Sequence, residues 1–266
     1  MGHTIGFVSV KGGVGKTTMA LEVASALVKY YDKHVLVVDC NFSAPNVHLY
    51  LGIEPGLTLH DVLAEDTGYG MHKAIYEKYG FDVVPASLYY KDKVDILKLK
   101  RSLSRLRNRY DFIILDSSPN YDEMIPVVAA AEKIFIVTTP DLQTFTTSLK
   151  SAILAKKEET PIHGIIVNRI RNPKYELDLK DIEDLGGIPV VAKIKDSKKM
   201  GKALYYREPM CVHSDSDCIT REIRKLASAL VGEPSQPGGF FGKLFGWTGL
   251  IGKEEVNRDL MRSEFY

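Results

Sequence analysis

The sequence lacks any apolar run near the roughly 20 residues that a membrane-spanning helix needs. Among its 266 residues only three are cysteines, Cys40, Cys211 and Cys218, and no two of them form a CxxC pair. An odd number of cysteines without that spacing argues against a disulfide framework and against a zinc site of the usual kind. These absences favour a protein of a reducing compartment, and we expect it in the cytoplasm.

An excess of either charge is also absent. The 35 lysines and arginines nearly balance the 34 aspartates and glutamates, so the formal net charge is +1. No global field therefore draws the chain to nucleic acid or anionic lipid, and any such binding must be local. The hydrophobic fraction of 45% excludes collagen-like and disordered chains and allows a sizeable core.

Short apolar runs alternate with segments of helical periodicity along most of the chain. Near-continuous apolar runs are typical of strands that are buried on both faces. The expected strands are residues 4–10, 34–39, 81–85, 112–116, 133–137, 164–168 and 188–191. The expected helices are residues 17–30, 92–109, 123–131, 142–157 and 219–230. This alternation predicts an α/β fold with a mostly parallel, doubly wound sheet and helices on both faces.

The composition changes after Val231, where the chain continues Gly-Glu-Pro-Ser-Gln-Pro-Gly-Gly. A segment rich in glycine and proline is typical of a linker. We therefore expect one nucleotide-binding domain in residues 1–231, a linker in residues 232–239 and a C-terminal tail in residues 240–266.

A glycine-rich segment, Lys-Gly-Gly-Val-Gly-Lys-Thr-Thr, occupies residues 11–18 between the first expected strand and the first expected helix. Glycines let several backbone N–H groups turn toward one anion, and the start of the helix adds its dipole. In such a loop Lys16 supplies a positive charge and Thr17 a hydroxyl for Mg²⁺. The first glycine of the usual phosphate-loop pattern is missing, but the position between strand and helix predicts a nucleotide site.

An additional lysine, Lys11, comes directly before these glycines. Two lysines at this spacing resemble the deviant Walker A loop of the ParA and MinD family of P-loop ATPases. Further segments are similar to that family in the same order: residues 39–46 resemble its switch I, residues 115–119 its Walker B strand and switch II, and residues 167–169 its adenine-binding strand end. The resemblance covers about residues 2–232 and implies a P-loop NTPase fold of the deviant Walker A type, with ATP and Mg²⁺ as cofactors.

The resemblance also implies roles for individual residues. Lys11 would reach the partner's phosphates in an ATP-dependent homodimer, and Thr17, Asp39 and Asp116 would hold Mg²⁺, through water in the case of the two acids. The implied nucleotide contacts are Lys11, Gly12, Gly13, Val14, Gly15, Lys16, Thr17, Thr18, Asn168, Arg169, Lys195 and Asp196. An alternative is that Asp39 and Asp116 only turn the chain toward solvent and that Asn168 only caps a loop.

One position departs from the family pattern. Many members carry in switch I a second aspartate that orients or deprotonates the attacking water, and here that residue is Asn41. An amide holds water but cannot accept its proton, so we expect slow hydrolysis with Lys11, Lys16 and Asn41 as the catalytic residues. The alternative is that Asn41 sits in a turn and another group positions the water.

The resemblance implies an ATPase switch whose dimer binds a membrane surface or a partner, positions cellular machinery and is released by hydrolysis. Its protein activator or cargo is not identified by the sequence. One alternative is an Mrp-like metal or iron–sulfur carrier, although Cys211 and Cys218 lack a CxxC spacing. Another is a ParA-type DNA binder, since basic residues gather in residues 193–225, but acidic residues interrupt them.

The tail contains an amphipathic pattern in residues 240–251. At 100° per residue one stripe holds Phe240, Phe241, Leu244, Phe245, Trp247 and Ile251. A helix of this length rises only about 18 Å, too short to span a bilayer but suited to its interface. It is similar in kind to the C-terminal membrane helix of the MinD family and predicts peripheral association with the inner face of the cell membrane. The alternative is that the stripe packs on its own domain or on a partner.

Overall fold

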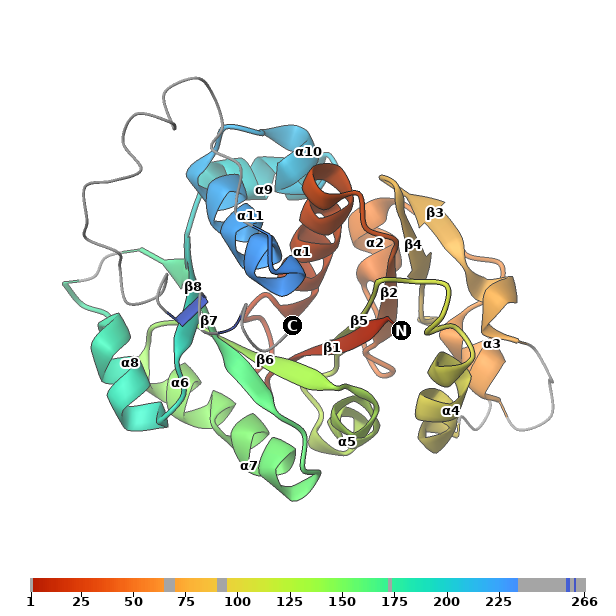
Figure 1. The fold of residues 1–266 in the computed structure, drawn as a ribbon, viewed down its shortest axis with the longest axis horizontal. Coiled ribbons are helices and arrows are strands. Elements are labelled where there is room, and N and C mark those ends of the chain that lie inside the picture. The colour runs from red at the N-terminus through yellow and green to blue at the C-terminus, as the bar shows by residue number, and fades with distance from the viewer. Residues whose placement is uncertain are drawn as a thin grey trace.

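A computed structural model describes residues 2–64, 70–89, 95–171 and 174–233, together with Asn257, Arg258 and Met261. In this part of the chain eight strands form one sheet in the order β3-β4-β2-β5-β1-β6-β7-β8 (Figure 1). Their bounds are β1 His3–Val8, β2 Val35–Cys40, β3 Tyr76–Lys78, β4 Phe81–Val84, β5 Phe112–Ser117, β6 Lys133–Thr138, β7 Ile162–Ile170 and β8 Val190–Lys195. Among the described strands only β3 and β4 pair antiparallel; the other neighbours are parallel, which confirms the predicted mostly parallel sheet.

Both faces of the sheet are buried, because successive side chains of a strand point to opposite faces. In β5, Phe112 and Ile114 belong to the core on one face, and Ile113 and Leu115 to the core on the other. A strand with two buried faces is apolar at nearly every position, which explains the uninterrupted apolar runs in the sequence.

Helices cover the two faces, as the doubly wound prediction requires (Figure 1). One face carries α1 (Lys16–Tyr31), α2 (Val47–Leu51), α9 (Lys198–Tyr205), α10 (Met210–His213) and α11 (Cys218–Val231). The other carries α3 (Leu59–Leu63), α4 (Leu99–Ser104), α5 (Tyr121–Ala130), α6 (Leu142–Ser148), α7 (Lys150–Lys157) and α8 (Leu179–Gly186). Two 3₁₀ helices, η1 (Met71–Ala74) and η2 (Ile96–Lys98), complete the described elements. None of the helices in the described ranges is long and apolar enough to cross a membrane.

Two helix predictions are wrong in extent. The helix expected over residues 92–109 is the short η2 followed by α4. After α4 the backbone N–H groups of Leu106 and Arg109 each donate to the carbonyl three residues earlier, so the chain continues in tight turns. The helix expected over residues 142–157 divides into α6 and α7 at Leu149. There Ser148 donates its hydroxyl to the carbonyl of Thr144 at 2.8 Å, a contact that bends helices.

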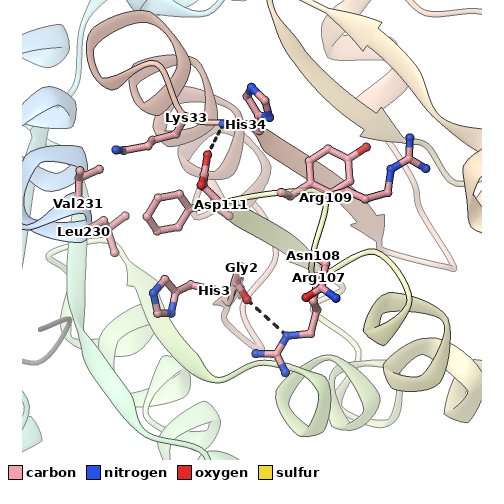
Figure 2. A pocket seen from close by; sticks show the side chains of 12 residues that line it. Gly2, His3, Lys33, His34, Arg107, Asn108, Arg109, Asp111, Leu230 and Val231 are labelled. Carbon is pink, nitrogen blue, oxygen red and sulfur yellow. Dashed lines mark hydrogen bonds between the residues drawn. The ribbon is translucent and has the colours of Figure 1, made fainter.

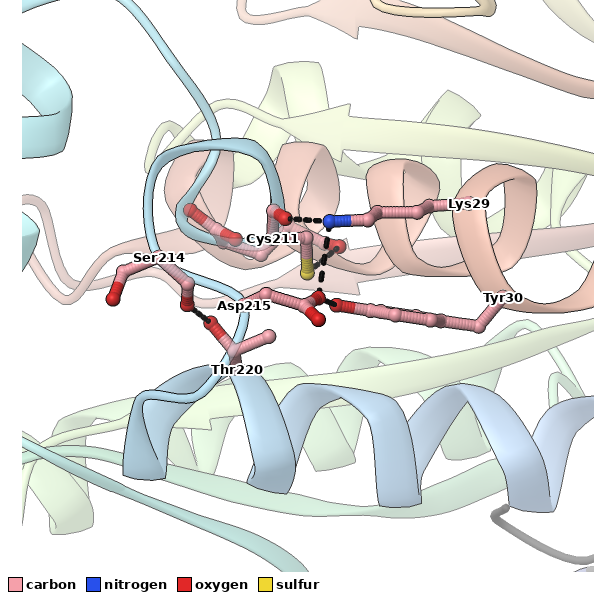
Figure 3. Close-up of polar contacts among 7 residues, drawn as sticks. Lys29, Tyr30, Cys211, Ser214, Asp215 and Thr220 are labelled. Atoms are coloured by element: carbon pink, nitrogen blue, oxygen red, sulfur yellow. Dashed lines mark hydrogen bonds and ion pairs between the residues drawn. The ribbon is translucent and has the colours of Figure 1, made fainter. Parts of the chain in front are cut away.

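The C-terminal end of α1 is hydrogen-bonded to α10 and to the connection between α10 and α11 (Figure 3). Lys29 Nζ donates to the Cys211 carbonyl at 2.6 Å and to Asp215 Oδ1 at 3.0 Å, and the Tyr30 hydroxyl also donates to Asp215. The Thr220 hydroxyl donates to the carbonyl of Ser214 at 2.7 Å. The helix that begins at the glycine-rich loop is therefore fixed at its other end.

The predicted division of the chain at residues 231 and 239 stays a prediction. The amphipathic stripe of residues 240–251 lies outside the described residues. Within the predicted tail, however, Arg258 and Met261 are only 4% and 3% exposed, and Met261 belongs to the core cluster that contains α1 and α11. These two residues of the predicted tail thus lie against the domain.

Candidate functional site

The glycine-rich loop connects β1 to α1 at the carboxyl edge of the sheet, where ligands bind in doubly wound folds. Gly13 and Gly15 have φ angles of 78° and 99°, in the left-handed region that glycine adopts without strain. A side chain at Gly15 would also lie 2.2 Å from Asn168 Nδ2. Both glycines are therefore required for the loop to curve around an anion in front of the helix start.

The two lysines of the loop have different surroundings. Lys16 is buried, and its Nζ donates to the Lys11 carbonyl at 3.3 Å across the loop. Burial lowers the pKa of Lys16, and the nearby Asp116 carboxyl offsets part of that effect. Lys11 is exposed, and among the residues that the structure describes its ammonium group makes no hydrogen bond or ion pair.

Thr17 and two buried acids meet beside the loop. Asp39 of β2 and Asp116 of β5 are register partners on adjacent strands. The Thr17 hydroxyl donates to Asp116 Oδ2 at 2.5 Å, while Asp116 Oδ1 is buried and has no hydrogen-bond partner. Asp39 accepts the backbone N–H groups of Asn46 and Val47, each at 3.1 Å, so it fixes the start of α2.

The two carboxyls disfavour each other's charge. Burial raises the pKa of Asp39, and the neighbouring Asp116 carboxyl raises it further. Burial also raises the pKa of Asp116, against the opposing effects of the Thr17 hydroxyl and Lys16. A divalent cation would remove this penalty, and hydroxyl and carboxylate oxygens are the ligands that Mg²⁺ prefers. The unsatisfied Asp116 Oδ1 and this donor set therefore fit magnesium.

Asn41 lies in the turn after β2 and lines the cavity beside the loop. Its Nδ2 donates to the Ala44 carbonyl at 2.6 Å, and its Oδ1 is buried without a hydrogen-bond partner. The amide nitrogen is thus used by the turn, whereas the oxygen is left as an acceptor without a donor. Both of the interpretations that the sequence allowed have a counterpart in this geometry.

Asn168, at the end of β7, contacts the loop directly. Its Nδ2 donates to the Val14 carbonyl at 2.8 Å, and its Oδ1 accepts the N–H of Arg169 at 2.9 Å. Asp196 is held on the same side, since its N–H donates to the Ile170 carbonyl at 2.9 Å. The strand end that the sequence predicts to contact adenine is therefore also hydrogen-bonded to the phosphate loop.

Two cavities adjoin at Arg169, which lines both. The first, about 240 Å³, is lined by the loop and switch residues Gly12, Gly13, Gly15, Lys16, Thr17, Asn41, Ala44, Asn46, Tyr50, Ser117, Pro119 and Arg169. The second, about 200 Å³, is lined by Thr18, Asn168, Arg169, Arg171, Ile194, Lys195, Asp196, Ser197, Met200, Gly201 and Leu204. Two adjoining cavities, one at the glycine-rich loop and one at the ends of β7 and β8, suit the phosphates and the base of one nucleotide.

Most predicted site residues lie at these two cavities. The exceptions are Lys11, which is exposed, Val14, whose carbonyl is used by Asn168, and the acids Asp39 and Asp116, which are buried beneath the loop. The sequence analysis placed Asn46 at the end of the switch I segment but gave it no role in the site, whereas its Oδ1 lies 3.1 Å from the Thr17 hydroxyl oxygen. It also missed Arg171, whose Nε donates to Asp196 Oδ2 at 2.6 Å; no local pattern pointed to it.

Another hollow, about 410 Å³, lies at the opposite edge of the sheet, near the starts of β1 and β5 (Figure 2). Three of the charged residues that line it already have partners. Lys33 pairs with Glu233 at 3.2 Å, Arg107 pairs with Glu132, and Asp111 accepts the backbone N–H of His34 at 2.8 Å. Since it is also far from the carboxyl ends of the strands, we do not assign the nucleotide to it.

Comparison with known proteins identifies the family. Over residues 5–210 the chain matches the CobQ/CobB/MinD/ParA nucleotide binding domain. The chain belongs to this family. The resemblance to MinD and ParA proteins that the sequence motifs carried is thereby confirmed, together with the P-loop NTPase fold.

Three similar proteins place the chain within the MinD/ParA family. An uncharacterised ATP-binding protein of Methanocaldococcus jannaschii is 30% identical over 237 residues, which cover 87% of this chain and 89% of that protein. MinD of Pyrococcus horikoshii, a septum site-determining protein solved with Mg-ADP, is 27% identical, with a TM-score of 0.81 and coverage of 86% of this chain and 96% of that one. The MinC:MinD cell division complex of Aquifex aeolicus contains a chain that is 26% identical, with a TM-score of 0.78 and coverage of 87% and 96%.

At the level of the family, these relatives support the expected cofactors, ATP and magnesium. Cys211, by contrast, gives no support to a metal carrier. Cys211 is buried, its Sγ lies 3.9 Å from the Glu22 carbonyl, and burial raises the pKa of its thiol well above the ordinary value. A thiol in that state is a poor metal ligand, because metals bind the thiolate.

Proposed function

We propose that this chain is an ATP-driven switch. Mg-ATP joins two copies into a sandwich dimer, the dimer binds a membrane surface or a protein partner to position cellular machinery, and slow hydrolysis releases it. The observation that carries this proposal is the contrast between the two loop lysines. Lys16 is buried at the phosphate cavity, whereas Lys11 leaves its ammonium group in solvent, available to a second copy.

Nucleotide binding relies on the chain's own donors. The N–H groups at the start of α1 have no carbonyl partners within the helix and point toward the bound phosphates. Lys16 adds a charge to the terminal phosphates, and the residues around Arg169 and Asp196 contact the base. Bound Mg²⁺ would neutralise phosphate charge, held by Thr17 and, through water, by Asp39 and Asp116.

Hydrolysis in this proposal depends on positioning rather than on a base. Asn41 Oδ1 accepts a hydrogen bond from the attacking water but takes no proton from it. Lys16 and the partner's Lys11 stabilise the charge that spreads over the transferred phosphoryl group. The rate is therefore expected to be low.

A switch needs a part whose position depends on the nucleotide. Asp39 connects the predicted metal site to the start of α2 through two N–H groups, and Asn46 contacts the Thr17 hydroxyl. A change in ligation at Thr17 and Asp39 would therefore be transmitted to residues 41–47. Asn41, Ala44 and Asn46 of this segment line the phosphate cavity, so the segment is suited to report the γ-phosphate to a second copy.

The membrane part of the proposal rests on the apolar stripe of residues 240–251. One stripe with four glycines nearby binds lipid weakly, and two stripes in one dimer bind with an avidity increased about 100-fold. The experiment is co-sedimentation of the full chain with anionic liposomes in ATP and in ADP. We expect more bound protein in ATP, and we expect Phe241→Asp to abolish binding without reducing ATP affinity. Equal sedimentation in both nucleotides would contradict the proposal.

A further inference from the structure

The C-terminal segment returns to the domain at the edge of the sheet. Asn257, Arg258 and Met261 have helical backbone, and residues four apart on a helix share one face. In Figure 1 the short deep-blue piece of this segment lies beside β8, the last strand of the sheet. We name these three residues the clasp.

Arg258 is the buried centre of the clasp. Its side chain is 4% exposed, and its Nη1 donates to Glu222 Oε1 of α11 at 2.7 Å and to the Val191 carbonyl of β8 at 2.8 Å. Glu222 is itself only 11% exposed in its side chain. A buried charge is costly unless it is paired and hydrogen-bonded, so this contact requires both partners to be present.

The Val191 carbonyl is available because β8 contains an irregularity. Ile165 and Ile166 of β7 pair with Val190 and Ala192, so Val191 is an extra residue in β8. Its side chain packs against Gly164, where an added Cβ would lie 2.5 Å from Val191 Cγ1. Such a bulge redirects backbone groups at a sheet edge, and Arg258 supplies a donor to the carbonyl there.

Asn257 makes a second set of contacts beside the first. Its Nδ2 donates to Glu183 Oε1 of α8 at 2.7 Å and to the Val190 carbonyl at 3.3 Å. Glu183 Oε1 also accepts the Val190 N–H at 2.8 Å. The groups that accept these hydrogen bonds from Asn257 and Arg258 are two carboxylates, from α8 and α11, and two carbonyls of β8. We name these four groups, on Glu183, Val190, Val191 and Glu222, the acceptor slot.

We propose that the acceptor slot is a docking site for the chain's own C-terminal segment, with Arg258 as the specifying residue. A slot with two carboxylates and two carbonyls as acceptors suits a guanidinium and an amide nitrogen, and the clasp offers both. Met261, 3% exposed, adds an apolar contact to the core around α1 and α11. The segment also covers part of an edge strand that would otherwise present its backbone to other chains.

The consequence concerns the 23 residues from 234 to 256, which begin at the end of α11 and end at the clasp. Because both ends are attached to the domain, residues 240–251 are connected to it at two points instead of one. This conclusion does not depend on what those residues bind. It also means that truncation after Pro237 removes the clasp together with the stripe, so a point substitution is the cleaner test of the stripe.

Trypsin provides the test, because it cleaves after arginine only when the bond is accessible. In the full-length protein we expect slow cleavage after Arg258. Glu222→Gln keeps Arg258 but removes its charged partner, and we expect cleavage there to rise about tenfold or more, since cleavage follows the population of the open form. Arg258→Lys keeps a site that trypsin cleaves but replaces the planar guanidinium with an ammonium group. We expect its cleavage rate to lie between those of the wild type and Glu222→Gln.

Glu233→Gln is the matched control, because it removes the carboxylate of an exposed ion pair with Lys33 at the end of α11. It should leave cleavage after Arg258 unchanged. Unchanged ATP affinity and circular dichroism would show that each variant is folded, and hydrogen exchange in residues 257–261 gives a second readout if Glu222→Gln is unstable. Equal cleavage after Arg258 in the wild type and Glu222→Gln, or full exchange of residues 257–261 in the wild type, would overturn the proposal.

Discussion

Asn168 Nδ2 donates a hydrogen bond to the Val14 carbonyl at 2.8 Å, joining the end of β7 to the middle of the phosphate loop. The contact links two segments that lie 154 residues apart in the chain. It also explains why Gly15 must be glycine, since a Cβ there would collide with the same amide. The strand end beside the proposed base cavity and the phosphate loop are therefore directly connected by a hydrogen bond.

We expect Asn168→Ala to weaken ATP binding by about tenfold, because a buried carbonyl loses its donor and the loop loses its support. A fluorescent ATP analogue would measure the affinity. Asn168→Asp is the matched variant: it keeps the shape but replaces the donor with an acceptor, and it should be at least as harmful. An unchanged affinity in both variants would mean that the loop holds its conformation without Asn168.

Lys16→Ala should reduce Mg-ATP affinity by about 100-fold or more, since it removes a buried charge that we propose to contact the terminal phosphates. Isothermal titration calorimetry with ATP and magnesium would measure this. The matched control is Lys29→Ala on the same helix, which changes contacts at the far end and should retain binding. Full affinity in Lys16→Ala would place the phosphates elsewhere.

Asn41→Asp should raise the turnover of ATP by about tenfold or more, because a carboxylate accepts the proton of the attacking water. A phosphate-release assay at saturating ATP would measure the rate. Asn41→Ala is the companion variant and should lower the rate, since it removes the buried acceptor Oδ1. If Asn41→Asp binds ATP and dimerises but hydrolyses it no faster, another residue positions the water.

The buried acid of α1 gives a prediction for pH. Glu22 accepts the Met210 N–H at 2.7 Å, and burial raises its pKa from an ordinary 4.5 to about 7. A carboxyl with a raised folded pKa favours folding below its unfolded pKa and loses that contribution as the pH rises through the folded value. Between about pH 5 and pH 8 the wild type should therefore lose on the order of 3 kcal/mol of unfolding free energy relative to Glu22→Gln. Urea denaturation of both proteins at several pH values would measure this. If the unfolding free energies of the wild type and Glu22→Gln change with pH in the same way, the prediction is contradicted.

The sequence allowed the sheet, the loop and most of the site to be predicted, for identifiable physical reasons. Strands such as β5 are buried on both faces, so their apolar runs stand out, and the loop is defined by glycines at fixed spacing. The division of residues 142–157 was not predictable, because it depends on the hydroxyl of Ser148 turning back to a carbonyl within α6.

Long-range polar contacts were equally hidden from the sequence. The pairing of Arg171 with Asp196 and that of Glu222 with Arg258 depend on which elements the fold brings together. No periodicity or spacing indicates such a pair. The tail was treated as one element, whereas Arg258 and Met261 lie against the domain.

The central claim is that ATP drives dimerisation through Lys11. Sedimentation velocity of the wild type, Lys11→Ala and Lys16→Ala, each with ATP and with ADP in the presence of magnesium, tests it most directly. We predict a dimer only for the wild type in ATP, with Lys11→Ala remaining a monomer although it still binds ATP as a monomer. A Lys11→Ala protein that forms as much dimer in ATP as the wild type would contradict the account.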